Sequence, residues 1–206
     1  MMVDNLLVSA VSFGRNTIGL VLRPYETYRR IVDRGSPWEL VYVGVLVILY
    51  FALASVVKVA AFRPFLLTKQ AVALVAAASL TYALVVWLTW FVGQRFGSKA
   101  HIKSIAVGWG YTMIPTVCWF LMTSILYVLL PPPRTTSLAG IAFSVLFLVV
   151  SATLFFWKVT LGYLTFRFGL KFDLVKILSV VGIVGPIVGI WSWGLYRLGI
   201  FKVPFL

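Results

Sequence analysis

The chain has 206 residues, of which 62% are hydrophobic and 11% charged, and its mean hydropathy is +1.03. A soluble domain is typically about half apolar and about 25% charged, so this composition excludes a soluble globular protein and predicts an integral membrane protein. The net charge is +13, with only five acidic residues. Because the basic residues lie between long hydrophobic runs, we expect them to meet anionic lipid headgroups, and we expect no nucleic-acid partner.

The N-terminal segment is apolar but interrupted. Residues 5–22 contain Asn5, Arg15, Asn16 and two glycines within a mostly hydrophobic run. This pattern favours an amphipathic segment that lies on the membrane surface, with a frayed tail as the alternative. Residues 1–36 are therefore predicted to form an amphipathic N-terminal segment on the cytoplasmic side.

A short helix is predicted to follow, because Pro24 fits the first turn of a helix. Tyr25 and Tyr28 are three residues apart and should share one face of this helix, with Arg29 close by. Residues 35–37, Gly-Ser-Pro, should end it.

Five membrane spans are predicted in residues 37–206, each long enough to cross a hydrocarbon core of about 30 Å. They cover residues 38–59, 70–92, 104–130, 137–162 and 174–196. Ser36 and Glu39 form an approximate capping box at the start of the first span, and Asp173 can cap the fifth. The predicted fold class is an all-α integral membrane bundle of five transmembrane helices, preceded by the short amphipathic segment.

The basic residues also predict how the chain crosses the membrane. With a cytoplasmic N-terminus, eleven basic residues near the span ends lie on the cytoplasmic side and six on the other. The positive-inside rule therefore favours a cytoplasmic N-terminus and an external C-terminus. The predicted cytoplasmic basic surface comprises Arg23, Arg29, Arg30, Arg34, Lys99, Lys103, Lys171 and Lys176.

Small residues and prolines inside the spans predict sites of helix packing or kinking. In the third and fifth spans the predicted packing and kink residues are Gly110, Pro115, Gly185, Pro186 and Gly189, together with Tyr111 beside Gly110. The Gly185-x-x-x-Gly189 pattern lets two helices approach closely, so it predicts a contact between copies of the chain.

No catalytic residue, metal site or cofactor is predicted. The single histidine, His101, lies in a loop, no paired acids lie inside a span, and no Cys/His cluster is present. Ionisable residues inside spans usually indicate transport. Lys58 and Lys158 are such residues, but each lies near a predicted span end, from which a lysine can snorkel to the interface.

Three stretches resemble the Yip family of polytopic membrane proteins, which are named after interaction with Ypt/Rab GTPases. They are RPYETYRRIVDRGSPWEL, FGSKAHIKSIAVGWGYTMIP and FFWKVTLGYLTFRFGLKFDLVKIL, within a likeness over about residues 23–196. The resemblance implies five spans, a cytoplasmic N-terminus and no catalytic residues. Eukaryotic members bind Rab GTPases through longer N-terminal regions than the roughly 36 residues here. The resemblance therefore implies a prokaryotic-type member in the plasma membrane, with an endoplasmic reticulum or Golgi membrane as the alternative.

The expected function is that of a non-enzymatic adaptor or scaffold for other membrane proteins or for membrane organisation. The alternative is a small transporter or channel whose path is lined by Tyr111, Thr112, Thr116 and Lys158. A lipid enzyme is disfavoured because acids and histidine are scarce. The environment of the Tyr111 hydroxyl, a polar cavity or another helix, should discriminate between transporter and adaptor.

Overall fold

The structure is a computed structural model that describes residues 2–58, 64–129 and 138–200. These residues form seven α-helices and one π-helical turn, η1, and contain no strand. The elements are α1 (Met2–Leu22), α2 (Pro24–Arg34), α3 (Glu39–Lys58), α4 (Pro64–Arg95), α5 (Ile102–Leu129), α6 (Leu138–Leu164), η1 (Thr165–Gly169) and α7 (Leu174–Arg197).

The prediction of an all-α membrane bundle is confirmed. Five helices are long and apolar enough to cross a membrane, namely α1, α4, α5, α6 (with η1) and α7. The candidate in α1 has the lowest mean hydropathy of the five, 1.2. The 20 residues of α3 match the first predicted span, and α3 forms a pair with α2 that is bent by 115°.

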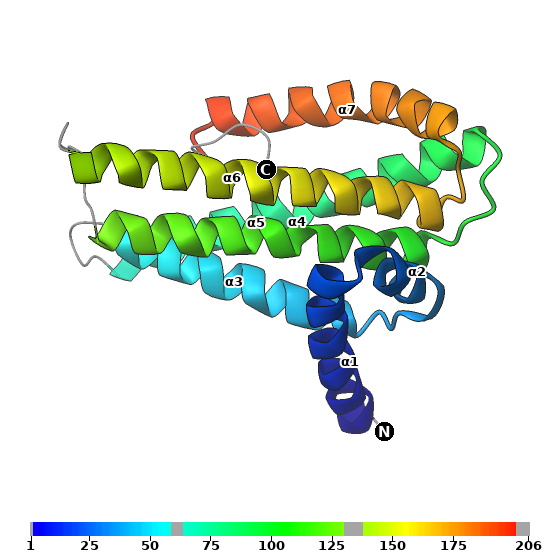
Figure 1. Cartoon of the computed structure of the whole chain (residues 1–206), viewed down its shortest axis with the longest axis horizontal. Coiled ribbons are helices and arrows are strands. Elements are labelled where there is room, and N and C mark those ends of the chain that lie inside the picture. Colours follow the sequence, from blue (N-terminus) through cyan, green and yellow to red (C-terminus); the bar gives the residue numbers. More distant parts are fainter. Residues whose placement is uncertain (1, 59–63, 130–137, 201–206) are drawn as a thin grey trace.

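The helices α3 to α7 run side by side and form the bundle, whereas α1 runs steeply across their direction (Figure 1). The short helix α2 lies at one end of the bundle, on the right in Figure 1. The connection from α4 to α5 and the connection from η1 to α7 lie at this same end, which we call the α2 end. Because α1 does not follow the bundle axis, α3 is the helix that completes the set of five helices running along the bundle.

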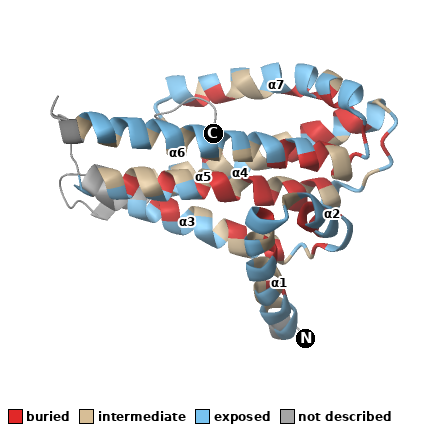
Figure 2. Ribbon diagram, viewed as in Figure 1, coloured by how far each residue is buried: buried red, intermediate tan, exposed pale blue. Residues whose placement is uncertain are grey.

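Three clusters of buried side chains hold the helices together. One joins α4, α5, η1 and α7 and includes Ile105 and Val180. The second joins α1, α2, α5 and α6 around Tyr28 and Leu161, and the third lies around Tyr50 and Phe120. Buried residues line the contacts between helices, while the outer sides of α6 and α7 are exposed (Figure 2). Those outer sides carry large apolar residues, as expected where lipid is the solvent.

Several predicted boundaries were wrong. The helix α4 begins at Pro64, within the segment predicted as a loop, since proline is compatible with the first helical position. The fourth span was predicted to end near residue 162, but the helical path continues through η1 to Gly169. Both α5 and α7 continue as single helices through their internal prolines, Pro115 and Pro186.

Candidate functional site

A buried carboxylate lies at the junction of the N-terminal helices and the bundle. Glu39, the first residue of α3, is 2% exposed. Its Oε1 atom accepts hydrogen bonds from Ser12 Oγ at 3.0 Å and from the Ser36 backbone N–H at 3.3 Å. Its Oε2 atom accepts from Asn16 Nδ2 at 3.1 Å and from the Tyr111 hydroxyl. Four donors therefore compensate the removal of this carboxylate from water.

Asn16 connects this carboxylate to α2. Its Nδ2 atom also lies 3.3 Å from the Tyr111 hydroxyl oxygen, and its Oδ1 atom accepts from Arg30 Nη2 at 3.0 Å. We call Ser12, Asn16, Arg30, Glu39 and Tyr111 the polar clamp, because they tie α1 and α2 to α3 and α5. Losing one partner of a buried charged group typically costs about 1–3 kcal/mol or more.

The sequence predicted other roles for these residues. The capping contacts are present, since the Trp38 N–H donates to Ser36 Oγ at 3.3 Å and the Ser36 N–H to Glu39. Arg30 was assigned to the basic surface; it is exposed, and its guanidinium also donates to Asn16. Tyr111 was assigned to packing, and its hydroxyl faces other helices and not a cavity. A usable signal was the spacing of Ser9, Ser12 and Asn16, which places three polar residues on one face of α1.

A second buried contact fixes α2 on the bundle. Tyr28 is fully buried; its hydroxyl donates to the Gly108 carbonyl oxygen at 2.5 Å and lies 2.6 Å from Thr165 Oγ1. Burial raises the pKa of Tyr28 above its usual range. A Cβ atom on Gly108 would lie 2.9 Å from Thr165 Cγ2, so glycine permits this close approach. The two tyrosines that were predicted to share a face of this helix have different surroundings, because Tyr28 is buried whereas Tyr25 is exposed and its ring contacts Phe168.

A basic cleft of about 290 Å³ lies at the α2 end. Its lining includes Lys99, His101, Lys171 and Lys176, which we call the basic cleft residues, together with Asp33 of α2. The cleft is held by a hydrogen bond from Ser98 Oγ to the Leu170 carbonyl oxygen at 3.0 Å, which joins the two connections at this end. The fold thus brings Lys99 close to Lys171 and Lys176, which lie far from it in the sequence.

The other residues of the predicted basic surface lie outside the cleft lining. Arg23 and Arg29 form exposed ion pairs with Glu26 at 3.9 Å and Asp33 at 4.0 Å, and such pairs contribute little to stability. Arg34 and Lys103 are exposed.

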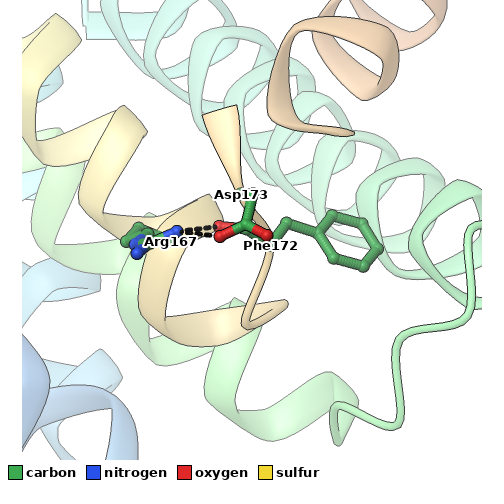
Figure 3. Close-up of polar contacts among 3 residues, drawn as sticks. All are labelled: Arg167, Phe172 and Asp173. Carbon is green, nitrogen blue, oxygen red and sulfur yellow. Dashed lines mark hydrogen bonds and ion pairs between the residues drawn. The ribbon is translucent and has the colours of Figure 1, made fainter. Parts of the chain in front are cut away.

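Asp173 occupies the N-cap position of α7, as predicted, but its side chain makes no capping hydrogen bond. Its carboxylate instead accepts from Arg167 Nη1 at 2.6 Å. The same guanidinium nitrogen donates to the Phe172 carbonyl oxygen at 2.9 Å (Figure 3). Arg167 of η1 therefore binds the Asp173 carboxylate in place of the backbone at the start of α7.

The predicted packing residues have different surroundings. A Cβ atom on Gly110 would lie 2.3 Å from Leu40 Cδ2, so this glycine allows α3 and α5 to touch. Pro115 is buried in α5, whereas Pro186 is exposed on α7. Gly185 and Gly189 line an internal cavity, and a Cβ atom on Gly185 would have no neighbour within 4 Å.

That internal cavity has a volume of about 380 Å³ and lies between α3, α4, α5, α6 and α7. Thr116 and Lys158, two of the four residues predicted to line a transport path, line this cavity. Tyr111 and Thr112 do not, because the first joins the polar clamp and the Thr112 hydroxyl donates to the Trp109 carbonyl oxygen at 2.7 Å. The side chain of Lys58 lies outside the described residues.

Fold and exposed surface together define an all-α integral membrane protein. In the part of the chain that the structure describes, no group of three or more His, Cys, Asp or Glu residues is placed to hold a metal ion. No protein-family model, curated protein or solved structure matches the chain. The candidate sites are therefore interpreted from their own chemistry.

Proposed function

We propose that the protein is a non-enzymatic membrane adaptor that holds an acidic segment of another membrane protein in the basic cleft. The observation that carries this proposal is the convergence of Lys99, Lys171 and Lys176 on one cleft with a single acidic residue, Asp33. An ammonium group attracts carboxylates without strict geometric demands, so such a cleft suits acidic partners of varied sequence. The resemblance to the Yip family supports the same class of function.

The helix α1 supports the membrane part of the proposal, because it buries polar side chains and exposes large apolar ones. Ser9 and Asn16 are buried on it, together with Leu20, while its outward side is mostly apolar. The exposed apolar residues are Leu7, Val8, Val11, Ile18, Val21 and Leu22. A helix that lies across the bundle direction with an apolar outer side fits the interface between headgroups and acyl chains. The polar clamp would then hold α2 and the cleft at the membrane surface.

We also propose that the α2 end faces the cytoplasm, with the N-terminus inside and the C-terminus outside. The connections from α4 to α5 and from η1 to α7 both lie at this end, and both carry basic residues. Enrichment of basic residues is typical of cytoplasmic connections. In agreement with the resemblance, we place the protein in a prokaryotic plasma membrane. Anionic headgroups would be further partners of the exposed arginines of α2.

The adaptor proposal predicts charge-dependent binding of a carboxylate-rich probe. The protein, in nanodiscs of zwitterionic lipid, is titrated with a fluorescent peptide of ten glutamates. We expect Lys176→Glu to weaken binding about fivefold, as for the loss of about 1 kcal/mol. Lys103→Glu is the matched control, because Lys103 is an exposed lysine in the first turn of a helix at the same end but outside the cleft lining. Equal weakening by both substitutions would contradict a specific cleft.

A small transporter is the second candidate function. It is supported by the internal cavity, which is lined by two residues of the predicted transport path, Thr116 and Lys158. Transport would require a path to both membrane surfaces along the cavity. Proteoliposomes that conduct no ions and take up no labelled small solutes above empty liposomes would dismiss this candidate. Uptake that is lost on substitution of Lys158 would favour it over the adaptor.

A further inference from the structure

The internal cavity contains an unusual combination of apolar walls and one unpaired cation. Most of its lining is aliphatic or aromatic, as at Val47, Phe51 and Val184. Among the described residues, Lys158 is the only charged residue in the lining, which contains no carboxylate from this part of the chain. Within the described parts of the chain, the Lys158 ammonium has no hydrogen bond or ion pair. A membrane interior strongly disfavours a charge that is left without a partner.

Snorkelling from a span end stays a prediction for Lys158. Lys158 lies eleven residues before Gly169, where this candidate span of 30 residues ends, which corresponds to about 16 Å of helix. Lys158 is therefore farther from the end of the span than the sequence predicted. Its side chain lines the cavity and is partly buried. The ammonium group is therefore available to a molecule inside the bundle.

The wall also contains polar side chains, which are Tyr50, Thr81, Tyr82, Trp109, Thr116 and Ser192. Thr81 and Tyr82 use their hydroxyls within the protein, since Thr81 Oγ1 donates to Ala77 and Tyr82 donates to the Ala106 carbonyl oxygen. Thr116 is different, because its Oγ1 atom is buried and has no hydrogen-bond partner among the described residues. This atom has almost no accessible surface, so it is closed to a ligand in the cavity.

The cavity reaches the outer surface of the bundle on the side of α7. Val181 and Gly185 line it and are also exposed on that helix. In a bilayer this surface borders the acyl chains, so a ligand could enter from the lipid phase. The volume of about 380 Å³ is near the lower end of the range for ligand pockets, about 300–1,000 Å³, and suits one hydrocarbon chain better than two.

We propose that this cavity binds a single-chain amphiphile from the membrane, with its hydrocarbon chain against the apolar walls and its anionic oxygen on Lys158 Nζ. The head group is a carboxylate or a phosphate, since either provides the oxygen that the ammonium group lacks. The basic cleft at the α2 end is a separate site.

The test uses the full-length protein in nanodiscs with a trace of palmitate that carries a photoreactive diazirine on its chain. Illumination followed by peptide mapping should place the adducts on cavity-lining segments of α5 and α7. Unlabelled palmitate and hexadecyl phosphate should compete, and their relative potency distinguishes a carboxylate from a phosphate ligand. Hexadecanol, which has the same chain and no charge, should compete at least tenfold more weakly.

Variants test the role of Lys158 directly. Lys158→Met should lower the labelling about tenfold or more, whereas Lys158→Arg, which keeps the charge, should retain most of it. Lys103→Met is the matched control, because Lys103 is an exposed lysine that lies outside both this cavity and the basic cleft. Undiminished labelling of Lys158→Met, competition by hexadecanol equal to that by palmitate, or adducts only outside the cavity would overturn the proposal. The comparison of competitors uses the wild-type protein, so it decides the matter even if a variant fails to fold.

Discussion

Replacing Asn16 by alanine should release α1 from the bundle. The substitution removes the hydrogen bonds from Nδ2 to Glu39 and Tyr111 and the bond that Arg30 donates to Oδ1. Two of these bonds involve charged groups, and each such bond contributes about 1.5–3 kcal/mol. Taking the lower value for each gives a loss of about 3 kcal/mol in the free energy of opening α1, or about a hundredfold in its open population.

Native-state hydrogen exchange of the protein in nanodiscs, read by mass spectrometry, measures this opening. Backbone amides of α1 should exchange about a hundredfold faster in Asn16→Ala, while amides in the buried part of α7 keep their rates. The chain has only one other asparagine, Asn5, which is exposed on the same helix and makes a matched control as Asn5→Ala. If both variants exchange alike in α1, the polar clamp does not hold this helix.

Three further results are expected. Gly110→Ala should lower the Tm, because overpacking against Leu40 costs about 1–3 kcal/mol of stability. Adding Leu40→Ala should recover part of this loss, and a double variant that is no more stable than Gly110→Ala would contradict the contact between the two residues. Because burial raises the pKa of Tyr28, the folded state keeps this phenol neutral, so its contribution to stability is complete below about pH 10 and declines as the pH rises further. Tyr28→Phe should therefore flatten the fall of Tm above pH 10, and Tyr25→Phe, at an exposed tyrosine, should not. Charged substitutions on the outer side of α1, such as Val11→Glu, should weaken retention of a peptide of residues 1–22 on vesicles, whereas Ser9→Glu on the inner side should have a smaller effect.

The sequence allowed the helices to be predicted well because span length and hydropathy are local properties. The predicted segments correspond to α3 to α7, and Pro24 and Gly35 correctly marked the limits of α2. The start of α4 at Pro64 was missed, since a proline followed by apolar residues fits either a loop or the first turn of a helix. The orientation of α1 across the bundle was not predictable from its composition, which satisfies the criteria for a span as well as for a surface helix.

The candidate sites were harder to predict because each joins residues that are distant in the sequence. Glu39 could be assigned to capping from its local spacing, but its bond with Tyr111 spans 72 positions. Lys158 was misplaced because the predicted span ended too early; the π-helical turn extends the helical path by a further turn. The contact between copies of the chain through Gly185 and Gly189 stays a prediction. Replacing both residues by leucine should reduce the size of any oligomer measured by light scattering.

The adaptor proposal is tested most directly by crosslinking from inside the basic cleft in living cells. A photoreactive amino acid at His101, which lines the cleft, should give a discrete adduct with another membrane protein. That adduct should disappear in the Lys171→Glu/Lys176→Glu background, and the same probe at Val149, exposed on α6, should give only lipid adducts. An adduct at His101 that persists after both charge reversals, or no protein adduct at His101 at all, would contradict the account.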